Sequence, residues 1–147
     1  MIYVPDTNVL LRFATRADPQ HANVLSAIRK LKTGGETIQI LPQNCVEFWN
    51  VCTRPTSHNG FGLTVQQANH SLRLVERIFP LLPDNANVYK EWRKLVLNFG
   101  VSGVQVHDAR IAAAMLVHQV THILTFNTSD FARFSSAGIS AVDPKTL

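Results

Sequence analysis

Four acidic residues occupy positions in the sequence that could support metal-dependent chemistry. Asp6 separates two apolar runs in IYVPDTNVLL, and Glu47 lies within the apolar pattern CVEFWNV. Asp108 opens an alanine-rich stretch, and Asp130 follows the apolar run HILTF. The chain has fourteen Lys and Arg against ten Asp and Glu, and without these four acids the balance would rise from +4 to +8. If the four converge, the protein is a basic body with one acidic pocket.

Such a pocket would suit a hard divalent cation. Carboxylates brought within a few ångströms repel one another, and a cation between them offsets that repulsion. Oxygen ligands without His or Cys favour Mg²⁺ or Mn²⁺ over zinc. The basic surroundings would attract a phosphodiester, although a mild excess of positive charge does not by itself establish nucleic-acid binding.

A purely structural interpretation exists for each acid. Asp6, Asp108 and Asp130 could all serve as helix N-caps, and Glu47 could be a half-exposed helix residue. The two cysteines give no competing metal site, because the chain has no CxxC, HExxH or zinc-finger spacing. Cys45 and Cys52 lie seven positions apart in a predicted helix, about 10 Å along its axis, which is too far for a disulfide.

Composition predicts a single globular domain over residues 1–147. Apolar residues make up 46% and charged residues 16% of the chain, as in ordinary globular proteins. No segment approaches the roughly 18 uninterrupted apolar residues of a membrane helix, so we expect no membrane association. The N-terminus lacks the basic region of a signal peptide, and we therefore expect a cytoplasmic protein.

Apolar periodicity and turn residues predict strands that alternate with helices. The predicted strands cover residues 2–5, 37–41, 79–82, 122–126 and about 139–142. The predicted helices follow Asp6 and cover residues 20–32, 43–53, 64–78, 85–100 and 108–119. This alternation indicates a mainly parallel sheet covered on both faces, in which ligands bind at the carboxyl ends of the strands.

Four motifs in order give the chain a family resemblance. DTNVLLR, VEFWNV, HDARIAAAM and LTFNTSDFARF together resemble the PIN domain, and more narrowly the VapC-type ribonuclease toxins of bacterial toxin–antitoxin pairs. The resemblance extends from Ile2 to about Phe134. It implies a three-layer α/β/α sandwich, Mg²⁺- or Mn²⁺-dependent RNA cleavage, a homodimer and a cognate antitoxin protein.

The resemblance also assigns roles to individual residues. Asp6, Glu47, Asp108 and Asp130 match the acidic quartet that binds the metal and catalyses cleavage. Supporting polar positions match Thr7, Asn8 and Asn127. The family often has a second acid where this chain has Asn127, so the ligands around the metal would carry one negative charge fewer. Pro5 also departs from the usual aliphatic residue, and its missing amide hydrogen suits only the end of a strand.

We hypothesise that metal-activated water attacks the phosphorus in line, while metal charge stabilises the departing 3′-oxygen. The products would be a 5′-phosphate and a 3′-hydroxyl, with no need for a protein general base. The arginines near the acids are candidates for binding substrate phosphates, and we expect at least half of them to be surface or salt-bridge residues: Arg12, Arg54, Arg110 and Arg133.

Other functions fit the same sequence. One alternative is a PIN nuclease for RNA maturation, and another is a non-catalytic PIN-like module that binds RNA or protein. An aspartate-nucleophile phosphotransferase is excluded because position 8 is Asn, which removes the DxD partner of Asp6. The dimer face is expected on the apolar helices after residue 20 or around 64–79, and substrate choice is expected to depend on loops such as SHNGFGL (57–63).

Overall fold

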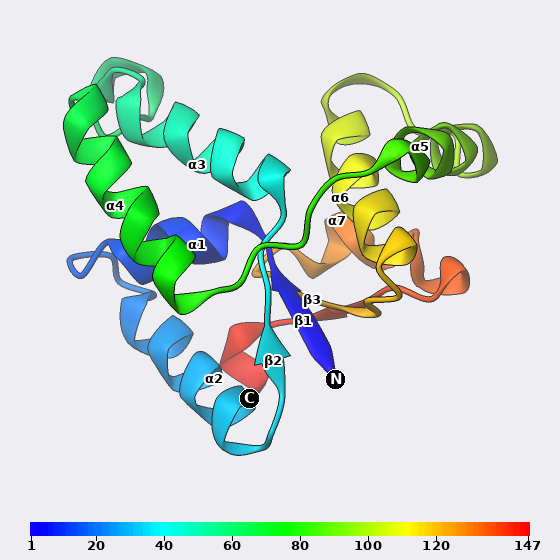
Figure 1. The fold of residues 1–147 in the computed structure, drawn as a ribbon, viewed down its shortest axis with the longest axis horizontal. Coiled ribbons are helices and arrows are strands. Elements are labelled where there is room, and N and C mark those ends of the chain that lie inside the picture. Colours follow the sequence, from blue (N-terminus) through cyan, green and yellow to red (C-terminus); the bar gives the residue numbers. More distant parts are fainter.

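The computed structural model describes residues 1–147 and has a four-stranded parallel sheet at its centre (Figure 1). The strand order is β2-β1-β3-β4, and every neighbouring pair is parallel. The strands are short: β1 (Ile2–Pro5), β2 (Thr37–Ile38), β3 (His122–Leu124) and β4 (Ser140–Val142).

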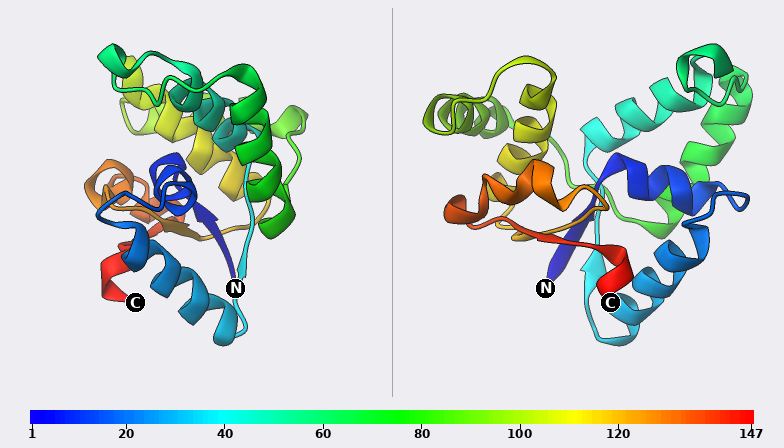
Figure 2. Two further views of the ribbon diagram at one scale, coloured as in Figure 1. Left: turned by 90° about the vertical axis from the view of Figure 1, so that its left-hand side faces the viewer. Right: turned by 180° about the vertical axis from the view of Figure 1, so that it is seen from behind.

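Seven α-helices cover the two faces of the sheet and confirm the predicted three-layer α/β/α sandwich (Figures 1 and 2). The helices are α1 (Thr7–Ala14), α2 (His21–Thr33), α3 (Pro42–Thr53), α4 (Val65–Ile78), α5 (Ala86–Asn98), α6 (Val106–Val117) and α7 (Thr128–Ala132). Helices α1 to α4 pack into one hydrophobic core, and α5 to α7 pack into a second core on the opposite face.

The alternation of side chains along the central strands explains why there are two cores. Tyr3 and Leu124 belong to the core formed with α1 to α4. Val4 and Ile123, their neighbours in sequence, belong to the core formed with α5 to α7. Because successive side chains of a strand point to opposite faces, two short central strands are enough to hold both helical layers.

The predicted strand over residues 79–82 is wrong. This segment contributes only one parallel bridge, between Ile40 and Leu81, and β2 ends at Ile38 instead of Leu41. Pro80 and Pro83 have no amide hydrogen, so the segment has too few donors to continue a ladder. It crosses the front of the molecule between α4 and α5 in Figure 1 and leaves Leu81 51% exposed.

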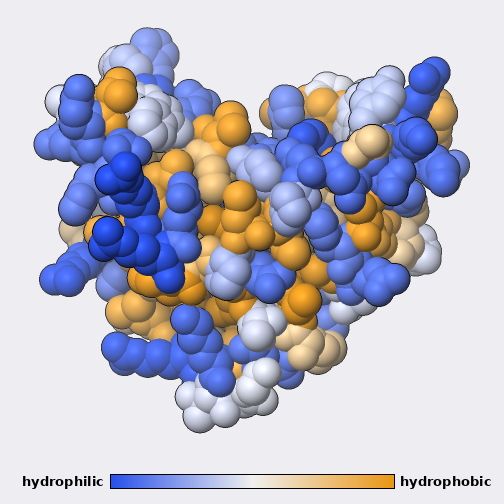
Figure 3. Space-filling model, viewed as in Figure 1, coloured by the Kyte–Doolittle hydropathy of each residue, from blue (hydrophilic) through white to orange (hydrophobic).

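Apolar surface lies near the middle of that same face in Figure 3, surrounded by hydrophilic side chains. The C-terminal turn lies against α2, where the Lys30 ammonium donates to the carbonyl of Leu147 (Figure 1). None of the helices is both long enough and apolar enough to span a membrane.

Candidate active site

The structure brings the four predicted acids into one cleft at the carboxyl ends of the central strands. Asp6, Glu47, Asp108 and Asp130 all line this hollow of about 440 Å³, which we call the acidic cleft. The predicted supporting residues Thr7, Asn8 and Asn127 line it too, and so does one candidate arginine, Arg54. Four lining residues were not singled out from the sequence: Leu11, Asn50, Val51 and Val104.

Asp6 is fixed by the sheet itself. Its backbone amide donates to the carbonyl of Leu124 at 2.8 Å, which continues the pairing of β1 and β3. Asp6 stands at the N-cap position of α1, but its side chain makes no capping hydrogen bond. One of its carboxylate oxygens, Oδ2, instead accepts a hydrogen bond of 2.9 Å from the buried hydroxyl of Thr125. The N-cap interpretation therefore does not explain the side chain of Asp6.

Asp108 and Asp130 occupy equivalent places in two helices. Each is the third residue of its helix, because α6 begins at Val106 and α7 begins at Thr128. The alternative interpretation of these two acids as N-caps therefore does not hold, because the N-cap residues are Gln105 and Asn127. Both acids nevertheless lie in a first turn, where the free N–H groups of the helix favour negative charge.

Glu47 reaches the cleft from α3 and is held by two donors. The hydroxyl of Thr7 donates to its Oε1 at 2.7 Å, and the amide of Gln43 donates to its Oε2 at 3.3 Å. Thr7 in turn accepts a hydrogen bond from Asn44 at 3.3 Å. Thr7, the residue after Asp6, therefore positions the carboxylate of Glu47, forty positions away.

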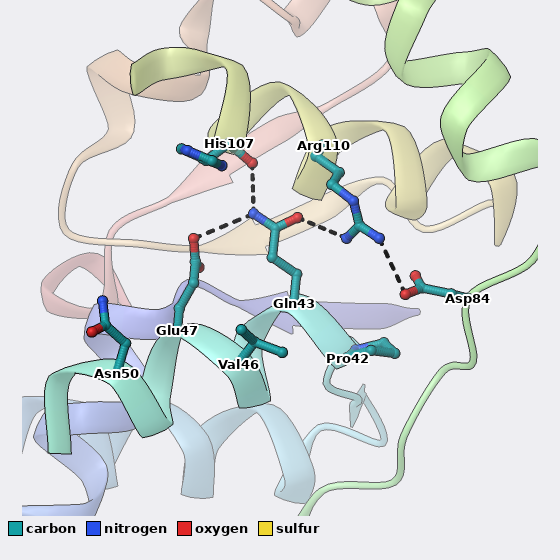
Figure 4. A pocket seen from close by; sticks show the side chains of 8 residues that line it. All are labelled: Pro42, Gln43, Val46, Glu47, Asn50, Asp84, His107 and Arg110. Carbon is teal, nitrogen blue, oxygen red and sulfur yellow. Dashed lines mark hydrogen bonds and ion pairs between the residues drawn. The ribbon is translucent and has the colours of Figure 1, made fainter. Parts of the chain in front are cut away.

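Gln43 connects α3 to α6 beside the acidic cleft (Figure 4). Its amide nitrogen also donates to the backbone carbonyl of His107 at 2.8 Å, and its oxygen accepts from Arg110 at 3.0 Å. Arg110 completes the chain of contacts through an ion pair of 3.2 Å with Asp84. This network fixes the distance between the helix that carries Glu47 and the first turn that carries Asp108.

Three supporting residues escaped the sequence analysis: Gln43, Asn44 and Thr125. Asn44 is fully buried, accepts from the amide of Leu41 at 2.8 Å and donates to the carbonyl of Pro5 at 3.2 Å. Thr125 directly follows β3, at the same sheet edge as Asp6, and that position was the one available signal for it. Nothing in the spacing of Gln43 and Asn44 indicates their partners.

The four candidate arginines have different surroundings. Arg110 is paired with Asp84, and Arg133 donates to the side chain of Gln105. Arg54 lines the acidic cleft, and Arg12 stacks over the ring of Phe126 at 4.7 Å. Two of the four thus have protein partners that account for their charge or position, and Arg12 and Arg54 remain the stronger candidates for substrate contacts.

The acids in the cleft disfavour one another's charge. Burial raises the pKa of Asp6, and the charges of Glu47 and Asp130 raise it further against the opposing hydrogen bonds from Thr125 and Thr7. Burial and the neighbouring carboxylates, Asp6 foremost, raise the pKa of Asp108 to about 6. The site therefore concentrates negative charge, and no ion pair within the protein neutralises these four acids.

The donor chemistry of the cleft fits a hard divalent cation. The available ligands are carboxylate and amide oxygens, which suit Mg²⁺ or Mn²⁺. No three of the chain's His, Cys, Asp and Glu side chains are arranged as a ready-made metal cage. The fit therefore rests on the donor set and on the charge repulsion among the acids, which a bound cation would relieve.

The fold and the cleft together define a class of α/β proteins with carboxylates at the ends of parallel strands. The family model of the PIN domain matches residues 3–136. The chain belongs to the PIN-domain family. No curated protein sequence is significantly similar to it.

Solved structures with the same fold include toxin–antitoxin proteins. VapBC-1 from nontypeable Haemophilus influenzae superposes with a TM-score of 0.70 at 17% identity, over 98% of each chain. FitAcB from Neisseria gonorrhoeae superposes with a TM-score of 0.64 at 20% identity, over 100% of each chain. VapC20 from Mycobacterium tuberculosis, described as a sarcin–ricin-loop-cleaving toxin, gives 0.66 at 15% identity over 97% of this chain and 98% of the other.

Proposed function

We propose that this protein is a Mg²⁺- or Mn²⁺-dependent endoribonuclease that acts as the toxin of a toxin–antitoxin pair. The observation that carries the proposal is the convergence of four carboxylates from α3, α6, α7 and the end of β1 in one cleft. A PIN-domain chain with this cleft has the ligands that a phosphodiester-cleaving metal centre requires. The VapC20 structure, whose fold this chain shares, is described as a sarcin–ricin-loop-cleaving toxin.

The side chains of the cleft would have two roles in such a site: the acids would bind the cation, and the threonines orient the acids. When bound, a divalent cation would lower the pKa of an attacking water and stabilise the negative charge that leaves with the 3′-oxygen. Asp6, Glu47, Asp108 and Asp130 would hold the cation with their carboxylates. Thr125 keeps Asp6 oriented and Thr7 keeps Glu47 oriented, because each hydroxyl donates directly to the carboxylate.

Asp6→Asn tests this proposal directly. The amide keeps the size of the side chain and an oxygen that accepts from Thr125, but it removes one ligand charge. We expect Mg²⁺-dependent cleavage of RNA to fall about 100-fold or more, with an unchanged circular dichroism spectrum. The readout is the rate of cleavage of a labelled structured RNA in Mg²⁺ and in EDTA.

Glu76→Gln is the matched control, because it removes one acid from the exposed surface of α4. It should cleave at the wild-type rate. Full activity of Asp6→Asn in Mg²⁺ would exclude the proposed role of the quartet. Complete absence of metal-dependent turnover in the wild-type protein would favour a non-catalytic module that only binds RNA or protein.

An antitoxin and a second copy of the chain are the partners we propose. Structures with the same fold are described as VapBC and FitAB complexes, several bound to DNA. The apolar side of α2 is used within the molecule, whereas α4 leaves Val65, Leu74 and Ile78 exposed. Growth arrest on expression, relieved by a co-expressed neighbouring small protein, would support the toxin role, and growth without arrest would favour an RNA-maturation nuclease.

A further inference from the structure

A second, smaller hollow continues from the acidic cleft along the side of α1 and α3. It has a volume of about 200 Å³, and we call it the arginine hollow. It shares four lining residues with the acidic cleft: Asn8, Leu11, Val51 and Arg54. Its other lining residues are Arg12, Asp18, Asn59 and Phe61. An extended ligand bound in the acidic cleft can therefore continue into the arginine hollow along the protein surface.

The loop after α3 holds Arg54 between the two hollows. The guanidinium of Arg54 donates to the carbonyl of Asn59 at 3.1 Å. The loop is fastened back onto α3, because the amides of Phe61 and Gly62 donate to the carbonyls of Val51 at 2.9 Å and Arg54 at 3.0 Å. A Cβ on Gly60 would lie only 2.2 Å from Cγ of Arg54, so glycine is what lets the loop close over this side chain.

The positive charges of this hollow have no ion-pair partners in the protein. The three ion pairs of the structure join the N-terminus to Glu36, Lys94 to Glu91, and Arg110 to Asp84. Nε of Arg54 is buried without a hydrogen-bond partner. Arg12 is held only by stacking on Phe126. Two guanidinium groups thus line one concavity without a carboxylate partner, although Arg54 uses one N–H on the carbonyl of Asn59.

The rest of the arginine hollow matches the other parts of a nucleotide. Phe61 is 40% exposed and lines the hollow, so its aromatic ring is accessible to a base. The side chain of Asn59 offers an amide donor and acceptor beside it. Asp18 also lines the hollow, and its carboxylate accepts from the amide of Gln20 at 2.8 Å. With Arg12 and Arg54 against Asp18, the hollow has a net charge of +1. A carboxylate here is a hydrogen-bond acceptor for a ribose hydroxyl or a base amino group.

We propose that the arginine hollow is a subsite for the nucleotide next to the cleaved phosphodiester of a single-stranded RNA segment. Arg12 and Arg54 bind its phosphate, Phe61 stacks on its base, and Asn59 contacts the base edge. The proposal rests on the proposed function for its ligand class, since it takes RNA as the substrate. The hollow around Gln43 and Arg110 on the other side of Glu47 is a weaker candidate, because Asp84 already neutralises that arginine.

The first test measures phosphate binding apart from cleavage. A fluorescein-labelled single-stranded RNA octamer is titrated with the Asp6→Asn protein in Mg²⁺ at several salt concentrations. Adding Arg12→Gln and Arg54→Gln should weaken binding about tenfold and reduce the slope of log K against log salt by about 0.7, for one phosphate that is no longer neutralised. Arg12→Gln alone, which breaks no hydrogen bond, should give about half of that change in slope.

The charge-matched control is Arg73→Gln with Arg77→Gln on exposed positions of α4, also in the Asp6→Asn protein. It should leave the slope unchanged. An unchanged slope in the Arg12/Arg54 variant, or an equal loss in the α4 control, would overturn the subsite and leave only a general charge effect. Thermal melting of every variant shows that each is folded.

The second test separates base stacking from phosphate binding. Phe61→Leu keeps an apolar side chain and should weaken binding of the octamer about fivefold, the lower end of base–aromatic stacking. Binding of an abasic octamer with the same backbone should not change. Equal loss with both ligands, or no loss with either, would overturn the assignment of Phe61.

Failure of the proposed function has a different signature. If the wild-type protein never cleaves RNA, the nuclease proposal fails, while the binding series still tests the subsite. If cleavage is metal-dependent and the binding series shows no effect, the nuclease proposal stands and the subsite is wrong.

Discussion

At the scale of single residues, two of the four acids in the cleft accept a hydrogen bond from a hydroxyl. Thr125 donates to Asp6, and Thr7 donates to Glu47. A carboxylate removed from water loses solvation, and a donor from the protein replaces part of it. The hydroxyls therefore let the acids remain in place before a cation arrives.

Thr125→Val tests this dependence. Valine keeps the shape of the buried side chain but leaves Oδ2 of Asp6 without its donor, so the pKa of Asp6 should rise further. We expect a loss of about 1–3 kcal/mol in the free energy of unfolding, measured by urea titration. Thr125→Ser, which keeps the hydroxyl, should lose less, and an equal loss in both variants would mean that packing and not the hydrogen bond matters.

Asp108 gives a pH-dependent prediction. Its pKa is raised from 3.8 to about 6, so its protonated form is favoured in the folded protein. The contribution of Asp108 to the free energy of unfolding is fully present below pH 3.8 and is lost as the pH rises through about 6. The full shift is about 3 kcal/mol, but the side chain is half exposed, and screening reduces it to about 1 kcal/mol.

Without metal, Asp108→Asn should therefore melt at a higher temperature than the wild type at pH 8. The difference should shrink as the pH falls and nearly disappear around pH 4, as measured by thermal melting in EDTA. Added Mg²⁺ should reverse the order at pH 8, because only the wild type keeps the ligand. A constant difference at all pH values would contradict the charge repulsion inferred for the cleft.

The sequence singled out the four acids and named Thr7 as a supporting residue. It indicated neither Thr125 as the partner of Asp6 nor Glu47 as the partner of Thr7. The acids stand at element ends or within apolar patterns, which single-chain periodicity can detect. The partner of Asp6 lies 119 positions away, and the partner of Glu47 lies 40 positions away. Such pairs exist only after the sheet and α3 are assembled, so local sequence patterns cannot predict them.

At the scale of elements, three helices begin at the acidic cleft without side-chain caps. Helices α1, α6 and α7 place their first turns there, and none has a side-chain capping bond. The acids carried near these ends lie close to the free N–H groups, which partly offset their mutual repulsion. This arrangement explains why the N-cap interpretation was attractive from sequence and wrong in detail.

The loop after α3 supplies the prediction at this scale. Gly60→Ala would place a Cβ 2.0 Å from the backbone oxygen of Arg54, so the loop or the end of α3 must shift. We expect a loss of about 1–3 kcal/mol in the free energy of unfolding. Gly34→Ala, with 3.3 Å to its nearest neighbour atom, is the control and should change the free energy of unfolding much less in the same denaturant titration. Equal stability of both variants would contradict the packing described here.

Element prediction succeeded where periodicity was strong and failed where prolines dominate. The helices were anticipated because their buried positions repeat at helical spacing. The segment from Phe79 to Leu82 has a strand-like apolar run, but Pro80 and Pro83 remove ladder donors, and a single bridge remains. Helix α6 begins at Val106, before the predicted start, because the turn from Gly103 to Gln105 leads directly into it.

At the scale of the whole molecule, the acidic cleft lies where the two helical layers meet over the end of the sheet. Glu47 comes from a helix of one layer, and Asp108 and Asp130 come from helices of the other. A cation held by both sets would link the layers. Its binding energy should then appear as stability of the entire protein.

Mg²⁺ should therefore raise the melting temperature. At 100 times its dissociation constant, a ligand that binds only the folded state adds about 2.7 kcal/mol. For a chain of this size that amounts to about 5–10 °C. Differential scanning calorimetry with increasing Mg²⁺ measures the shift, and Asp6→Asn combined with Asp108→Asn should abolish it. A wild-type melting temperature that does not respond to Mg²⁺ or Mn²⁺ would contradict the metal centre.

The anchoring of Asp6 to the sheet has a consequence for motion in the cleft. The amides of Asp6 and Thr125 donate to Leu124 at 2.8 Å and Val142 at 2.9 Å, so they exchange with solvent only when the sheet opens. The first turn of α6 is held separately, because Gln43 donates to the carbonyl of His107 and Trp92 donates to the carbonyl of Val106. The floor of the cleft thus belongs to the most protected part of the sheet. Asp6 therefore keeps its place whether or not a cation is bound.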